Sequence, residues 1–107
     1  MSKLDQINEE LLKSISEFIS REFYLPDTLI TITGVKCSKD LRFAAIYTSV
    51  LPDKLFGTAL DKLRKNNSQL SNFIKRHTKI RRIPKFQWIA DDTEKKAAEL
   101  EEVFKQI

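Results

Sequence analysis

The spacing of apolar positions predicts an amphipathic helix over residues 3–23. Apolar side chains recur at steps of three and four residues, which places them along one face of a helix. Ser2 followed by Asp5 resembles a capping box with Asp in place of Glu, and Pro26 cannot continue the helix. We therefore expect this helix to end before the proline and to cover one side of a sheet. The positions of its stripe are Leu4, Ile7, Leu11, Ile15, Phe18 and Ile19.

A strand is predicted over residues 29–37, with an irregularity near its middle. Its apolar side chains change parity between Ile32 and Val35, so they can share one face only if one extra residue is inserted. Gly34 lies at this change, and glycine is common at β-bulges. The sequence therefore predicts a bulge at this glycine and the threonine before it. Beyond the bulge, Cys37 should point inward as a small apolar group.

A second strand is predicted over residues 42–51, after a short polar connection that favours an antiparallel hairpin. Alternate positions from Ala44 to Val50 are expected to face the core. Phe43 and Tyr47 then lie on the opposite face of the sheet. There they could stack on bases or pack against a neighbouring chain segment.

Two short helices separated by a kink are predicted next. The first has an apolar side from Phe56 to Leu63, and a new stripe begins at Leu70 and continues to His77. The pattern breaks between them, where asparagine tolerates left-handed backbone angles and serine is a good N-cap. The kink is therefore placed at Asn66, Asn67 and Ser68.

The chain should close with a strand over residues 85–90, in which Phe86 and Trp88 face inward, followed by a last helix. Asp91-Asp92-Thr93 is expected to cap this helix, whose stripe runs from Ala97 to Ile107. The predicted order is helix, strand, strand, helix, kink, helix, strand, helix. This is an α+β fold with a three-stranded sheet and helices packed on one face.

Charge is distributed unevenly along the chain. Residues 62–90 hold nine lysines and arginines and no carboxylate, whereas the rest has ten basic and fifteen acidic residues. Such asymmetry favours a polyanionic partner over a simply solvated face. Arg76 and Lys79 lie three apart and are expected to share one helix face. The candidate contacts are Arg64, Lys65, Lys75, Arg76, Lys79, Arg81, Arg82 and Lys85.

Composition excludes several classes of protein. The single cysteine cannot form a disulfide framework or a cysteine-based zinc cluster, and it fits a reducing compartment. Two glycines are too few for a phosphate-cradling loop. No apolar run reaches the roughly 18 residues of a membrane span, and the N-terminus lacks the apolar core of a signal peptide. We expect no cofactor and no membrane association.

Candidate catalytic groups are few. His77 falls on an apolar stripe, which favours a satisfied, partly buried histidine. Spacing leaves a Cys37–His77 nucleophile pair open, but no third orienting group is signalled. Asp91 and Asp92 precede a helix, so capping explains them better than metal binding or acid–base chemistry. The sequence predicts a binding protein and not an enzyme.

Two segments resemble the ribosome-binding factor A family. The stretch from Thr31 to Arg42, running on to Val50, is similar to the family's signature hairpin. The stretch from Arg81 to Trp88, followed by Asp-Asp-Thr, is similar to its last strand and Asp-Asp-Ser turn. The resemblance covers about residues 4–105 and implies that residues 1–107 form a single type II KH-like RNA-binding domain.

The resemblance also implies a function. Family members are bacterial, cytoplasmic factors that bind the immature 30S small subunit and its 16S rRNA, act late in rRNA processing and maturation, and are important in cold adaptation. The family carries an Ala-x-Gly kink between two helices, where this chain has Asn66-Asn67-Ser68 without the glycine. We expect a monomer that binds free 30S subunits and no small-molecule substrate. The alternative is a basic protein-interaction adaptor without direct RNA contact, anchored by Phe43 and Tyr47.

Overall fold

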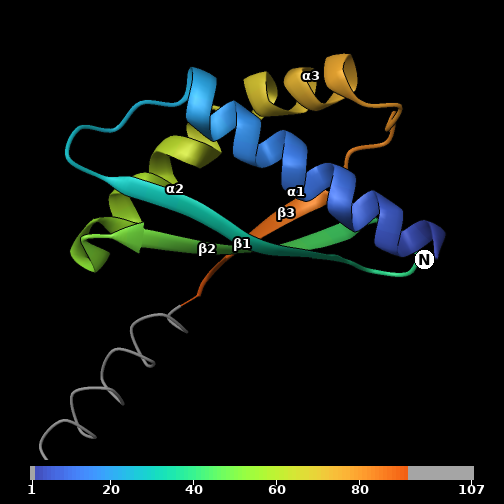
Figure 1. The fold of residues 1–107 in the computed structure, drawn as a ribbon, viewed down its shortest axis with the longest axis horizontal. Helices are drawn as coiled ribbons and strands as arrows, with labels where there is room; N and C mark the ends of the chain where they lie inside the picture. The colour runs from blue at the N-terminus through green and yellow to red at the C-terminus, as the bar shows by residue number, and fades with distance from the viewer. Residues whose placement is uncertain (1, 92–107) are drawn as a thin grey trace, which may run out of the picture.

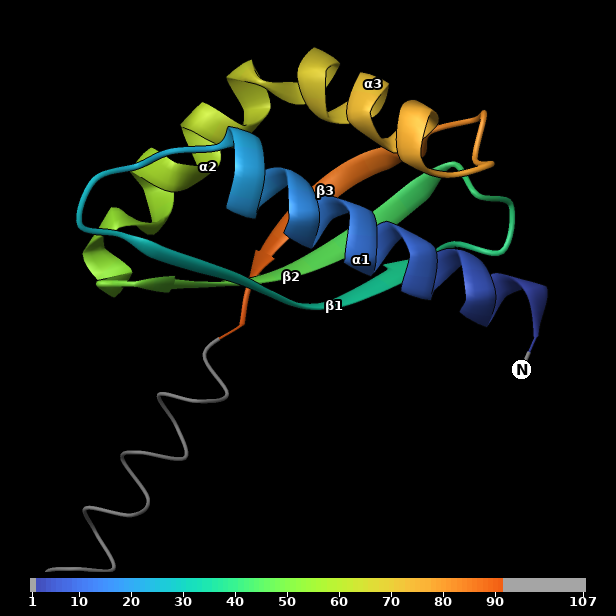
Figure 2. The same cartoon turned by 45° about the horizontal axis from the view of Figure 1, so that its top comes forward.

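The computed structural model describes residues 2–91, which form one layer of helices over one sheet (Figures 1 and 2). The predicted order is confirmed as far as the third strand, and the predicted last helix lies outside the described residues. The elements are α1 (Lys3–Glu22), β1 (Leu29–Cys37), β2 (Phe43–Leu51), the 3-10 helix η1 (Asp53–Leu55), α2 (Phe56–Lys65), α3 (Asn67–His77) and β3 (Lys85–Ala90).

The sheet has the strand order β1-β2-β3. β1 and β2 pair antiparallel as a hairpin, and β2 and β3 pair parallel. A parallel pair needs a crossover connection, which here is the α2–α3 helix pair. The crossover places α2 and α3 on one face of the sheet. Figure 2 shows α1 on that same face. The register of β1 against β2 shifts between Ile32 and Gly34, which confirms the predicted bulge.

The first helix begins and ends as its sequence predicts. The backbone N–H of Asp5 donates to Oγ of Ser2 over 3.1 Å, and the Ser2 N–H donates to Oδ2 of Asp5 over 3.4 Å. This reciprocal pair is a capping box, which satisfies two of the otherwise unpaired donors at the start of α1. The helix stops at Glu22, before Pro26 and the turn at Asp27.

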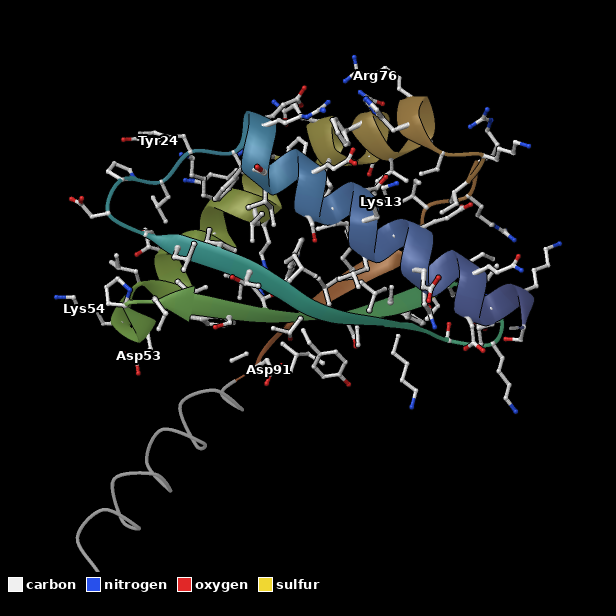
Figure 3. The ribbon with its side chains drawn as sticks, viewed as in Figure 1. Lys13, Tyr24, Asp53, Lys54, Arg76 and Asp91 are labelled. Atoms are coloured by element: carbon white, nitrogen blue, oxygen red, sulfur yellow. The ribbon has the colours of Figure 1, made fainter. Side chains whose placement is uncertain are left out.

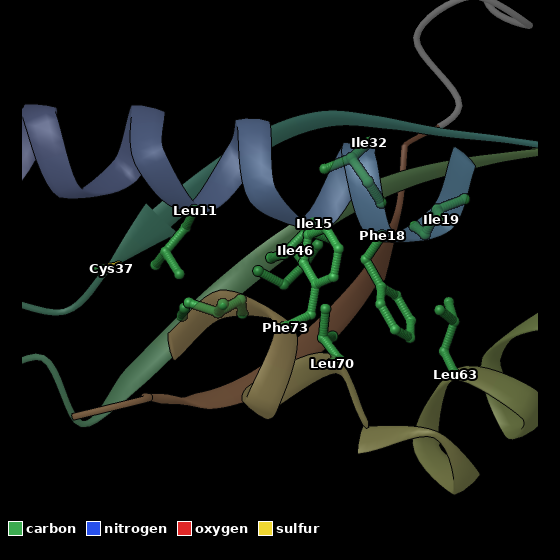
Figure 4. Close-up of a cluster of buried hydrophobic side chains, with 12 residues drawn as sticks. Leu11, Ile15, Phe18, Ile19, Ile32, Cys37, Ile46, Leu63, Leu70 and Phe73 are labelled. Carbon is green, nitrogen blue, oxygen red and sulfur yellow. The ribbon is translucent and has the colours of Figure 1, made fainter. Parts of the chain in front are cut away.

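The core lies between the helix layer and the inner face of the sheet (Figure 4). Phe18 of α1 and Phe73 of α3 pack edge to face with ring centroids 5.6 Å apart. Ile46 of β2 is fully buried beneath them. Cys37 is buried as predicted, and its backbone N–H donates to Oδ1 of Asn8 over 2.9 Å. These contacts fix α1 and α3 in place above the sheet.

The kink between α2 and α3 is confined to one residue. Asn66 separates the helices with φ −99° and ψ 17°, so the left-handed backbone considered for this position is wrong. Ser68 is not an N-cap either, because it lies inside α3. The side-chain Nδ2 of Asn66 donates to the carbonyl oxygen of Lys62 over 2.8 Å. The backbone N–H of Asn66 donates to the same carbonyl over 3.1 Å, so Asn66 closes the last turn of α2 with a backbone that is not left-handed.

Candidate nucleic-acid interface

The eight cations singled out from the sequence are all exposed in the structure. They fall on successive parts of one path along the helix layer and into β3. Figure 3 shows Arg76 on the side of α3 that faces away from the sheet. Arg64 and Lys65 lie in the last turn of α2, Lys75 and Arg76 in the last turn of α3, Lys79, Arg81 and Arg82 in the connection to β3, and Lys85 at the start of β3.

These cations form two groups rather than one. α3 has 11 residues and is therefore about 16 Å long, at 1.5 Å per residue. Arg64 and Lys65 lie just before its first residue, whereas the other six cations lie at or beyond its last turn. We call these six residues the α3-end cluster: Lys75, Arg76, Lys79, Arg81, Arg82 and Lys85.

Within the α3-end cluster, the predicted pairing of Arg76 with Lys79 is wrong. The helix ends at His77, so Lys79 lies in the connection and does not share a helix face with Arg76. Arg76 and Lys75 instead line a polar groove with Gln69 and Glu22, at the far end of α1. The helix ends early because Thr78 adopts an extended backbone, with φ −137° and ψ 173°.

Lys79 lines a different groove, together with both arginines of the connection. Arg81 and Arg82 both border this groove, although neighbouring side chains of an extended strand would point to opposite sides. The connection is not a strand, so alternation of side chains does not apply to it. Lys3, from the first turn of α1, borders the same groove. Its place in the site was missed from the sequence, which carries no local signal that joins residue 3 to residues 79–82.

The guanidinium of Arg81 has a structural role beside its charge. Nη1 donates to the carbonyl oxygens of Lys75 and Thr78, over 3.0 and 3.1 Å. Carbonyls at the end of a helix lack partners within the helix and carry the negative end of its dipole. Arg81 therefore closes α3 and holds the connection against it.

Most of this positive charge is not neutralised within the described part of the chain. Among residues 2–91 the ion pairs are Arg64 with Asp61 at 3.9 Å and Arg42 with Asp40 at 3.7 Å, both on exposed side chains. No member of the α3-end cluster takes part in either pair. Exposed cations that lack internal counterions attract external anions over several ångströms.

The candidate catalytic groups do not form a reactive pair. Burial raises the pKa of the Cys37 thiol, which disfavours the nucleophilic thiolate. The Nδ1 atom of His77 lies 2.9 Å from the carbonyl oxygen of Phe73. The rings of these two residues stack with their centroids 3.9 Å apart. His77 is exposed and not partly buried as predicted, although one face of its ring stacks on Phe73.

The predicted carboxylate pair is only half described, because Asp92 lies outside residues 2–91. Asp91 accepts a hydrogen bond from Oγ1 of Thr33, at the bulge of β1, and its N–H donates to the carbonyl oxygen of Thr48. It thus ties the end of β3 to the other two strands. Within the described residues, no three histidine, cysteine, aspartate or glutamate side chains gather as metal ligands would. No helix in that part of the chain is long and apolar enough to cross a bilayer.

The open face of the sheet carries the aromatic residues considered as an adaptor surface. Phe43 keeps 45% of its surface exposed, and Ile89, the register partner of Tyr47, keeps 39%. Tyr47 is half-buried and lies over Gly34, where an added Cβ would be 3.6 Å from its Cδ2. This face therefore exposes apolar side chains, with Lys85 beside its register partner Phe43, and it lies opposite the helix layer.

Comparison with known families decides where this chain belongs. The family model for ribosome-binding factor A matches residues 3–104. The chain belongs to the ribosome-binding factor A family. Its observed arrangement of elements is the α+β, type II KH-like fold that the resemblance implies.

Related sequences and solved structures carry the same family name. Ribosome-binding factor A of Mycoplasmopsis pulmonis is 31% identical, over 98% of this chain and 93% of that protein. The Bdellovibrio bacteriovorus protein is 29% identical, over 98% and 80%. The crystal structure of ribosome-binding factor A from Thermus thermophilus has a TM-score of 0.72 at 21% identity, covering 83% of this chain and 97% of that one.

A second structural relative is described together with its target. It is a homology model of the Thermus thermophilus ribosome-binding factor A, fitted into the cryo-EM map of a 30S–factor complex. It has a TM-score of 0.68 at 22% identity and covers 79% of this chain and 91% of that one. At this identity the likeness establishes the shared fold.

Proposed function

We propose that this chain is a ribosome assembly factor that binds the immature 30S subunit through 16S rRNA and assists late rRNA processing and maturation. Membership of the ribosome-binding factor A family supports a ribosomal partner. A Thermus thermophilus relative with the same fold has been placed in a 30S complex. The proposed role is that of a cytoplasmic, monomeric binding protein without a cofactor, a small-molecule substrate or a catalytic step.

One observation carries the RNA part of the proposal: the α3-end cluster is exposed and forms no ion pair within the described residues. Lysine and arginine side chains that neutralise phosphates release condensed counterions, which favours binding. The core between α1, α3 and the sheet positions the backbone segments that carry these cations. A fixed arrangement of charges can discriminate a folded RNA by shape, which is how structured RNA is commonly recognised.

Co-sedimentation with purified immature 30S subunits at several salt concentrations tests this proposal. The wild-type chain should bind, and its affinity should fall steeply with salt. The Lys75→Ala/Arg76→Ala variant should bind more weakly and lose roughly 0.7–0.9 from the log–log salt slope for each phosphate contact removed. The matched control, Lys36→Ala/Lys54→Ala, removes the same charge from exposed positions outside the α3-end cluster, on β1 and η1.

An adaptor function remains the second candidate, because the open face exposes Phe43 and Ile89. It predicts that substitutions of Phe43 and Tyr47 cause a much larger loss of association with subunits than the Lys75→Ala/Arg76→Ala variant does. That result would overturn direct RNA binding through the α3-end cluster. The reverse result would exclude the adaptor.

A further inference from the structure

A groove of about 310 Å³ lies at the end of the molecule where three separate segments meet. It is formed by the start of α1, the β1–β2 hairpin, and the connection from α3 to β3, which Figure 2 shows on one side of the molecule. The backbone N–H of Lys85 donates to the carbonyl oxygen of Arg42 over 2.8 Å, which joins the connection to the hairpin. This volume lies at the lower end of the roughly 300–1,000 Å³ typical of ligand pockets.

The lining of the groove divides into an apolar part and a cationic part. Ile7, Leu41 and Ile80 are half-buried, and Pro84 beside them is buried. The cations around them are Lys3, Lys79, Arg81 and Arg82, against a single carboxylate, Glu10. Apolar surface bordered by cations suits a ligand that has an apolar ring and adjacent negative charge.

Leu41 reaches the groove through an unfavourable backbone conformation. Its φ is 60°, in the left-handed region that glycine and asparagine adopt far more readily than leucine. The turn is held by Ser38 Oγ, which donates to Asp40 over 2.7 Å, and by the Leu41 N–H, which donates to the Ser38 carbonyl over 3.0 Å. Backbone strain of this kind is concentrated at ligand-binding and active sites. In this chain the strained position holds a leucine, whose side chain forms part of the groove wall. Glycine would adopt the same backbone conformation with less strain.

Arg81 is prepared for binding by its bonds to the end of α3. Its guanidinium is already held by Lys75 and Thr78, so a ligand would immobilise little further side-chain freedom. Planar guanidinium groups, like aromatic rings, are surfaces on which proteins stack unpaired RNA bases. The apolar side chains beside Arg81 can pack against the ring of such a base. Gln6 and Glu10 add hydrogen-bond acceptors to the same groove, and these suit the N–H groups on the edge of a base.

We propose that this groove holds one unstacked base of single-stranded RNA, with its flanking phosphates on Lys3, Lys79 and Arg82. The inference rests on the proposed function and adds the class of RNA element recognised: an unpaired nucleotide rather than a regular duplex. An acidic peptide could also place its carboxylates on these cations, but acidic side chains offer no flat ring to the apolar wall and the Arg81 guanidinium.

Methyl NMR of the full chain tests the site directly. The probes are single-stranded hexaadenylate RNA and a hexamer of the same charge that lacks its bases. Hexaadenylate should shift the methyl resonances of Ile7, Leu41 and Ile80, while those of the core residues Ile15 and Ile46 should not move. The abasic hexamer should bind about fivefold more weakly, the low end of the loss known for a base stacked on an aromatic ring, because this groove offers a guanidinium and aliphatic side chains instead.

Leu41→Gly is the matching variant, since glycine accepts φ 60°, and the relief of strain offsets the loss of the Leu41 side chain at the edge of the core. It should fold normally and lose the preference for hexaadenylate over the abasic hexamer, whereas Lys54→Ala at the opposite end should keep it (Figure 3). Equal binding of the two hexamers by the wild-type chain would overturn the proposal. So would groove methyl shifts induced by hexaglutamate but not by RNA, because the occupant would then be a protein.

The outcomes separate this inference from the function on which it rests. If the hexamers bind equally while Lys75→Ala/Arg76→Ala weakens subunit binding, the base site is wrong and the ribosomal function stands. If the hexamers behave as expected while the chain does not co-sediment with subunits, the ribosomal function is wrong and the base site stands.

Discussion

Arg81 donates a hydrogen bond from Nη1 to the carbonyl oxygen of Lys75, 3.0 Å away, and so joins the α3–β3 connection to the last turn of α3. Sequence position alone would make Arg81 and Arg82 equivalent cations. In the structure only Arg81 closes the helix, and the two should therefore respond differently to substitution.

Arg81→Ala should lower the free energy of unfolding by about 1 kcal/mol, because it leaves helix-end carbonyls without their charged donor. Arg82→Ala should change it by no more than about 0.5 kcal/mol, as expected for an exposed side chain without such bonds. Urea denaturation of both variants at one pH measures the difference. Equal stability of the two variants would contradict the capping role.

Phe18 and Phe73 pack edge to face in the core, each with no more than 2% of its surface exposed. Phe18→Ala should cost about 3–5 kcal/mol, because it leaves a cavity between α1 and α3. The control is Phe43→Ala on the open face, where nearly half of the ring is already exposed and a much smaller loss is expected. Chemical denaturation of both variants checks this, and similar losses would contradict the assignment of the two faces.

The Cys37 thiol should react slowly in the native protein. It is buried beneath α1, and burial raises its pKa, so little thiolate is present at neutral pH. Labelling with a thiol reagent at pH 7.5 should become fast only when urea unfolds the chain. Rapid labelling without denaturant would contradict the burial. So would loss of subunit binding in a Cys37→Ala variant of unchanged stability.

Acid should weaken the β1–β2 hairpin turn through Asp40. The Ser38 hydroxyl and the Arg42 backbone N–H donate to this carboxylate and lower its pKa below the ordinary value. A carboxyl whose pKa is lower in the folded state stabilises that state above the unfolded pKa of about 3.9, and this contribution disappears as the pH falls through the folded pKa.

The wild-type chain should therefore lose more stability than Asp40→Asn when urea denaturation is compared at pH 6 and pH 3. The asparagine variant is the control for all other carboxylates, which titrate in both proteins. Parallel losses in the two proteins would show that these bonds contribute nothing measurable to stability.

Several features were determined by short stretches of sequence alone. The Ser2–Asp5 capping box follows from residues three apart, and the bulge at Gly34 follows from a change of parity within one strand. The burial of Cys37 follows from that same change. Each depends on backbone geometry within a few residues, where helix and strand periodicities leave few alternatives. The family resemblance likewise rests on contiguous motifs.

The candidate site was only partly determined in this way. The run of cations identified the charged surface, but residue spacing could not tell where α3 would stop, and this separates Arg76 from Lys79. Nor could it distinguish Arg81, which binds the helix end, from Arg82, which lies one residue further along the connection. These differences depend on which nearby polar groups hydrogen-bond to the last carbonyls of a helix. The alternation and periodicity of apolar residues do not describe that choice.

Tertiary structure alone decided that Lys3 borders the groove beside Lys79, more than seventy residues away along the chain. The same holds for the strained Leu41, which comes to that groove from the hairpin. Such neighbours are brought together by the packing of Phe18 against Phe73, and by the parallel pairing of β3 with β2. The sequence pattern identifies which faces are apolar, but the burial of those faces against one another fixes which distant polar residues meet at their edges.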